Sequence, residues 1–148
     1  MDALTIASTV MYAADITRKL QDTLERRFRD LNTAPQIFKV INERLLEFRV
    51  ILDILVKHLT VDHGKVPASL YATLARNCEN CSAHLQMLAE TLTVYFWELD
   101  KRGSSRVLQN YQARLEMHGR ALEKDVMAVE LTIWVLMQQY NKKLEEVM

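Results

Sequence analysis

The sequence predicts an all-α protein, an antiparallel up-down four-helix bundle whose long fourth helix is broken or overhangs the other three. Residues that turn the chain are scarce, with three Gly and two Pro among 148 residues, and strands joined by turns depend on such residues. Apolar residues make up 49% of the chain and recur at helical spacing. Short connections between long amphipathic helices predict antiparallel neighbours.

The predicted helices span residues 2–31, 36–60, 68–100 and 105–147 and form one domain. Asp2 is a suitable N-cap for the first helix, and Pro35 a suitable first-turn residue for the second. Gly64 and Pro67 separate the second helix from the third, and Gly103 separates the third from the fourth. Each break therefore combines a Gly or a Pro with short polar residues.

Each predicted helix carries one stripe of apolar residues that faces the core. The stripes include Ile6, Val10, Leu20, Leu24, Phe28 and Leu31; Ile41, Leu45 and Leu52; Leu74, Cys78, Cys81 and Leu85; and Leu115, Leu122, Val129 and Tyr140. At 1.5 Å per residue the fourth helix is roughly 60 Å long and the second under about 40 Å. The fourth helix is therefore expected either to break near His118 and Gly119 or to overhang the bundle.

The charge balance argues against nucleic acid as a partner. Nineteen basic and nineteen acidic residues give a net charge of zero, and no predicted helix carries a strong excess of one sign. No uncharged stretch is long and apolar enough for a confident membrane span. Asp2 is acidic and no basic region precedes the apolar start, so we expect no secretory signal and a cytoplasmic protein with reduced cysteines.

The beginning of the first helix has two apolar faces. No charge occurs between Asp2 and Asp15, and a second apolar face accompanies the core stripe. That second face consists of Leu4, Ala7, Met11 and Ala14. The pattern alone favours a helix whose first half is buried centrally. The alternative is a detachable apolar end that enters a membrane or a groove of a partner.

Basic residues follow this apolar start. They are Arg18, Lys19, Arg26, Arg27 and Arg29. Such a group can bind anionic lipid headgroups. Asp22 and Glu25 are interspersed among them at spacings that allow ion pairs along the helix, so a solvated, internally paired face is the favoured interpretation.

No catalytic, cofactor or metal site is expected. Cys78, Cys81 and His84 are spaced three apart, but a structural zinc site needs four ligands. The two cysteines also fall on the core stripe, which favours buried apolar thiols. The chain contains no Gly-rich phosphate loop and no hydrolase or metalloprotease motif. The remaining alternative is an enzyme or a small-molecule carrier that uses a pocket inside the bundle, for which a cavity lined by His84 or His118 would be the sign.

The fourth helix contains a stretch that is apolar nearly all the way round, residues 131–137. Such a helix either lies centrally in a bundle or contacts another chain. The candidates for an interface with a second copy or a regulatory protein are Leu131, Trp134, Val135 and Met137.

The opening from Met1 to Val10 resembles the start of fungal HeLo-like domains, which begin with a Met-Asp-Pro-Leu-Ser/Thr-like run and small apolar residues. The resemblance continues through Ala34 and Pro35 and the helix 37–59. It implies a helical effector domain of fungal immune-type receptors that acts in heterokaryon incompatibility or programmed cell death. Such a domain rests in the cytoplasm, uses no cofactor, self-associates and binds an anionic membrane surface once activated.

Carried onto this sequence, the resemblance assigns membrane or partner contact to the apolar start. The residues are Leu4, Ile6, Ala7, Val10 and Met11, and the five basic residues named above become secondary candidates for lipid headgroups. A regulatory protein or a receptor domain is a further expected partner. The alternative from a different class is a non-enzymatic scaffold that pairs through its fourth helix.

Overall fold

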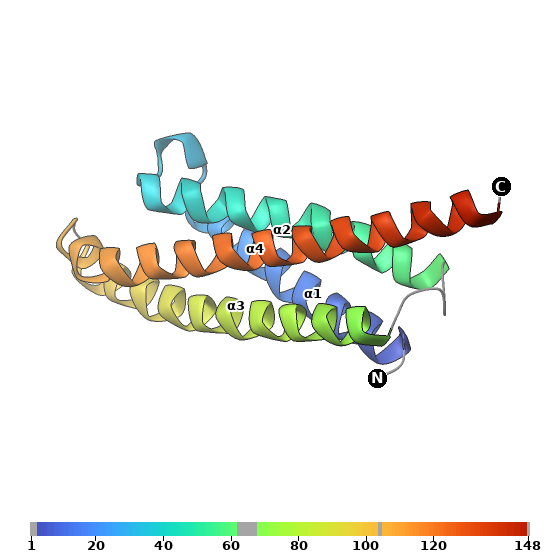
Figure 1. Ribbon diagram of the computed structural model, residues 1–148. Helices are drawn as coiled ribbons and strands as arrows, with labels where there is room; N and C mark the ends of the chain where they lie inside the picture. The colour runs from blue at the N-terminus through green and yellow to red at the C-terminus, as the bar shows by residue number, and fades with distance from the viewer. Residues whose placement is uncertain (1–2, 62–67, 104, 148) are drawn as a thin grey trace.

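A computed structural model describes residues 3–61, 68–103 and 105–147 (Figure 1). The α-helices in these ranges are α1 (Ala3–Arg27), α2 (Gln36–Val61), α3 (Ala68–Arg102) and α4 (Ser105–Val147), and a short 3-10 helix, η1 (Leu31–Thr33), follows α1. No strand occurs in the described ranges. The predicted all-α four-helix bundle is confirmed. The observed bounds of α2, α3 and α4 lie within two residues of the predicted ones.

The first helix is shorter than predicted. We expected it to reach residue 31, but α1 ends at Arg27. Asp30 has an extended backbone, and its carboxylate accepts a hydrogen bond of 3.0 Å from the backbone N–H of Asn32. This local bond competes with helix formation, as short acidic side chains commonly do, and it starts η1 instead. Phe28, just after the end of α1, is still partly buried against the core.

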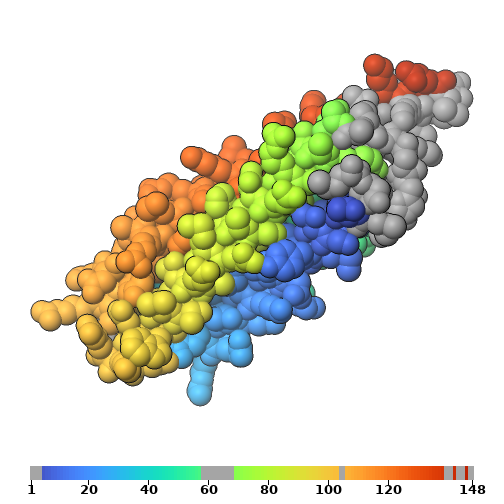
Figure 2. Space-filling model, turned by 90° about the horizontal axis from the view of Figure 1, so that it is seen from below, coloured from blue at the N-terminus to red at the C-terminus, as the bar shows by residue number. Residues whose placement is uncertain are grey.

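The helices form a ring in which neighbours in sequence are not always neighbours in space. α1 packs on α2 and α3, and α4 packs on the same two helices, so α2 lies diagonally from α3. Figure 1 shows α2 and α4 running in the same direction, and Figure 2 shows α3 between α1 and α4 on one face. Antiparallel packing of sequential neighbours therefore holds for α1 with α2 and for α3 with α4. α2 and α3 also run in opposite directions, as the up-down prediction requires, but they lie diagonally rather than side by side.

The fourth helix is continuous. α4 runs through His118 and Gly119 without a break, and a Cβ atom at Gly119 would meet no atom within 4 Å, so packing does not demand a glycine there. Figure 1 shows the last turns of α4 extending beyond the ends of α1 and α3. Of the two alternatives for this helix, the overhang is the one observed.

An aromatic cluster closes the end of the bundle where α1 meets α2. Phe38 is fully buried and lies 4.8 Å from Phe28, 5.4 Å from Tyr95 and 6.2 Å from Phe96, measured between ring centroids. Tyr111 of α4 contacts Tyr95 edge-on at 5.6 Å. All four helices or their flanks therefore meet at this end, and burial of large rings is a principal source of stability.

The two cysteines are free and buried in the core, as predicted. Burial raises the pKa of the Cys78 thiol to about 12, and it raises the pKa of Cys81 still further, with a smaller contribution from Asp125. A buried thiol with a raised pKa stays protonated and unreactive. Both residues therefore act as small apolar groups.

Candidate interaction surfaces and the polar seam

The apolar start of α1 is divided between the core and the surface. Ile6 and Val10 are fully buried, and Ala7 is partly buried against the core. Met11 is 58% exposed, and the side chain of Leu4 lies outside the described part of the structure. Ile6 and Val10 can therefore meet a membrane only if this half of α1 leaves the bundle.

The basic residues in α1 and just after it mostly form ion pairs or hydrogen bonds. Arg18 and Lys19 both bind Asp15, at 2.6 and 3.0 Å. The hydrogen bond from Lys19 is the largest influence that lowers the pKa of Asp15. Arg27 binds Asp100 of α3 at 2.5 Å. Arg29 is exposed. A solvated, internally paired face was the favoured interpretation. Arg18 and Lys19 do form ion pairs along the helix, but their partner is Asp15 rather than Asp22 or Glu25.

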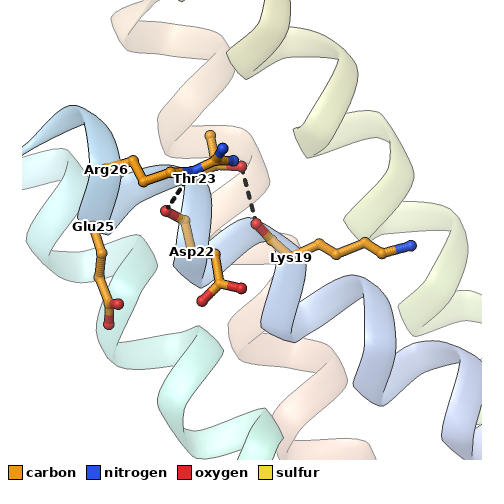
Figure 3. Close-up of a pocket in the computed structure, with 5 residues that line it drawn as sticks. All are labelled: Lys19, Asp22, Thr23, Glu25 and Arg26. Atoms are coloured by element: carbon orange, nitrogen blue, oxygen red, sulfur yellow. Dashed lines mark hydrogen bonds between the residues drawn. The ribbon is translucent and has the colours of Figure 1, made fainter.

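An open depression of about 660 Å³ lies on the outer face of α1 (Figure 3). Its lining residues are Lys19, Asp22, Thr23, Glu25 and Arg26. The Thr23 hydroxyl donates to the Lys19 carbonyl at 2.9 Å, and the Arg26 Nε donates to the Asp22 carbonyl at 3.3 Å. Figure 3 shows the Lys19 and Glu25 side chains extending in different directions. Because the lining groups come from one helix and do not converge, this depression lacks the features of a binding pocket.

The outer face of α4 carries an exposed apolar stripe. Met127, Leu131 and Trp134 are 62%, 64% and 60% exposed, and their spacing places them side by side on the helix. Val135 is half-buried and Met137 is half-exposed. We refer to Met127, Leu131 and Trp134 as the α4 stripe. Three large apolar side chains together on the surface are typical of an interaction site.

A series of polar pairs connects α3 to α4, and we call it the polar seam. The pairs are Asn77 with Thr132, His84 with Asp125, Thr91 with His118, and Glu98 with Tyr111. The first three join atoms 2.9, 2.5 and 2.8 Å apart. Successive pairs are seven residues apart on both helices. This repeat returns each pair to the same side of two antiparallel helices.

The two central pairs of the seam contain His84 and His118. Burial is the main influence on Asp125 and raises its pKa, and the contact with His84 partly offsets that rise. Burial also lowers the pKa of His118, and the nearby His84 and Arg114 lower it further. A groove of about 420 Å³ opens here between the two helices. Its lining residues are His84, Met87, Glu90, Thr91, Arg114, Met117, His118 and Ala121.

The groove does not form a metal site. Within the described residues, no group of three or more His, Cys, Asp or Glu side chains is arranged to hold a metal ion. His84 and Cys81 both come close to Asp125, but the two thiols lie in the core. The polar seam was not predicted from the sequence. The signal that could have found it is the repeat of polar residues every seven positions on two consecutive helices.

No described helix contains a segment long and apolar enough to span a membrane. No family model, no curated protein and no solved structure matches the chain.

Proposed function

We propose that this chain is a non-enzymatic HeLo-like effector domain, which self-associates and engages anionic membranes through the first half of α1 in regulated cell death. The observation that carries the proposal is the uncharged stretch from Ala3 to Ala14. It buries Ile6 and Val10 in the core while it leaves Met11 exposed on the surface. A helix with apolar groups on both faces can exchange the apolar core of the bundle for the apolar interior of a membrane.

The position of Met11 allows a test that leaves the fold intact. Met11→Glu places a charge on a side chain that is already 58% exposed, so little loss of stability is expected. The matched control is Met117→Glu on α4, where the methionine is 62% exposed. Dye leakage and co-flotation with anionic and neutral vesicles measure the effect. We expect Met11→Glu to reduce binding to anionic vesicles and Met117→Glu to leave it unchanged. Equal binding by both variants would contradict the proposal.

A second pair of variants tests the requirement for release of α1. Ile6→Ala removes buried contacts between α1 and the core, at a cost of about 2–5 kcal/mol. Leu88→Ala creates a cavity at a fully buried site on α3 and is the control for general loss of stability. We expect Ile6→Ala to increase leakage more than Leu88→Ala does at equal stability. Equal leakage from both variants would indicate nonspecific unfolding.

The α4 stripe favours a second candidate function, a scaffold that pairs with its own copy or with a regulatory protein. Trp134 is 60% exposed, so the bundle itself does not bury this side chain. Aromatic residues in exposed apolar patches are frequent anchors of protein interfaces. Under this alternative the membrane assays give no signal, and substitutions in the α4 stripe change the sedimentation behaviour instead.

A further inference from the structure

We propose that the packing of α3 on α4 at the polar seam is sensitive to acid and becomes weaker when His118 takes up a proton. This inference goes beyond the proposed function and does not depend on it. It rests on the position of His118 within the polar seam, on its bond to Thr91 and on the charges around it.

The geometry favours a neutral imidazole at His118. The ring is half-buried between α3 and α4, and its Nε2 lies 2.8 Å from the hydroxyl of Thr91. A hydroxyl can satisfy a neutral imidazole as donor or as acceptor. Among the described residues, no carboxylate forms a hydrogen bond or an ion pair with His118. A proton on this ring therefore introduces a partly buried charge without a direct counter-ion, which is costly.

The surrounding charges increase that cost. Arg114 of α4 and His84 of α3 both lie near His118 and both disfavour a further positive charge. Asp125 is bonded to His84 and is therefore already engaged. Glu90 lines the same groove from an exposed position on α3, where solvent screens its charge. Burial and these neighbours together hold the pKa of His118 below its ordinary value.

His84 has a different partner. Its Nδ1 lies 2.5 Å from the Asp125 carboxylate, whereas His118 is bonded to the neutral hydroxyl of Thr91. The two histidines are therefore not equivalent, and the acid sensitivity is assigned to His118 alone.

The sign of the effect follows from the direction of the pKa shift. The pKa of His118 in the folded chain lies below the ordinary value of 6.5, so the unfolded chain takes up this proton more readily. The contribution of His118 to stability is intact above about pH 6.5 and is lost as the pH falls below that value. At pH 5.5 the unfolding constant rises by up to about tenfold from this group.

The test compares the wild-type chain with His118→Gln in urea unfolding at pH 7.5 and pH 5.5. Glutamine keeps a polar group opposite Thr91 but does not titrate. Both proteins retain the other three histidines, so the difference between their pH dependences isolates His118. We expect the wild type to lose more stability on acidification than His118→Gln, by several-fold in the unfolding constant. His84→Gln is the control: it removes one of the neighbours that disfavour a proton on His118, so it should reduce the His118 effect without abolishing it, because burial is the main cause.

An NMR titration of the His118 ring in the wild-type chain provides a measurement that does not require any variant to fold. A midpoint below 6.5, with amide exchange in α3 and α4 near the groove rising over the same pH range, supports the proposal. A midpoint at or above 6.5, or identical pH dependence in the wild type and His118→Gln, overturns it.

Discussion

The guanidinium of Arg27 lies against both the carboxylate of Asp100 and the ring of Phe96. Its two terminal nitrogens are 2.5 and 3.1 Å from the carboxylate oxygens, and its central carbon is 4.5 Å from the ring centroid. The contact joins the C-terminal ends of α1 and α3 beside the aromatic cluster. A planar guanidinium is suited to bind a carboxylate with two nitrogens while it stacks on a ring.

Arg27→Ala should lower the free energy of unfolding by roughly 1 kcal/mol, because it removes the ring contact and the packing of the side chain on Phe96. Arg27→Lys should lose part of this stabilisation, since an ammonium group cannot form the two-nitrogen contact. Urea unfolding measures the effect. Arg26→Ala is the control, because Arg26 is exposed and its Nε bonds the carbonyl of Asp22 on its own helix. Equal loss in both variants would contradict the role of the Phe96 contact.

Asp100 should make stability depend on pH in the acid range. The hydrogen bond from Arg27 holds the pKa of Asp100 below its ordinary value of 3.8. Its contribution is therefore present above about pH 3.8 and is lost as the pH falls through the folded-state value. Unfolding measured between pH 5 and pH 3 should show a smaller decline in Asp100→Asn than in the wild type. An unchanged slope would show that solvent screens the pair completely.

Phe38→Ala should be among the most destabilising single substitutions. The Phe38 ring is fully buried and contacts three other aromatic rings. Removal of a buried phenylalanine costs about 3–5 kcal/mol. Thermal and urea unfolding give the value, with Phe38→Leu as the milder variant that fills part of the cavity. A loss under about 1 kcal/mol would mean that the cluster repacks around the missing ring.

The two cysteines should be inert in the folded protein. Burial holds the thiol of Cys78 at a pKa of about 12 and affects Cys81 in the same direction. Only the thiolate attacks a thiol reagent. At neutral pH we therefore expect slow labelling that follows the opening of α3, and rapid labelling of both thiols in denaturant. Fast labelling of the native chain would mean that the two thiols are accessible to solvent and are not buried in the core.

Trp134→Ala should leave the stability of the monomer within about 0.5 kcal/mol of the wild type, because the side chain is largely exposed. If the α4 stripe is an interface, the same change weakens self-association. Sedimentation velocity over a range of concentrations measures this, and Trp97→Ala on α3, where the indole is 58% exposed, is the matched control. If the wild-type protein stays monomeric at all concentrations, the α4 stripe is not a contact between two copies of this chain.

The fold was predictable because spacing alone determines which side of each helix is buried. Ile41, Leu85 and Leu122 lie in the core as their stripes indicate. The end of α1 was not predicted. Phe28 and Leu31 continue the helical spacing of apolar residues, so the pattern gives no sign that Asp30 begins a separate 3-10 helix. The order of the helices around the ring was not predictable either. An apolar stripe identifies a buried face, but it does not specify which helix covers that face.

The candidate sites were predictable only in part. The apolar pattern of residues 131–137 identified Leu131 and Trp134 as interface candidates, but it could not decide between the core and the surface, where the structure places them. For Ile6 and Val10 the same pattern was correct about burial, while any role in membrane contact stays a prediction. The polar seam depends on the relative register of α3 and α4. An apolar stripe does not specify that register, because it identifies the buried face of a helix and not the position of the helix along its axis.

The ring order of the helices separates the two candidate surfaces. α1 and α4 occupy opposite corners, with α2 and α3 between them. A partner bound along the outer face of α4 therefore leaves the outer face of α1 unobstructed. Two ligands can occupy this small domain at the same time, one at each corner, without a steric conflict between them.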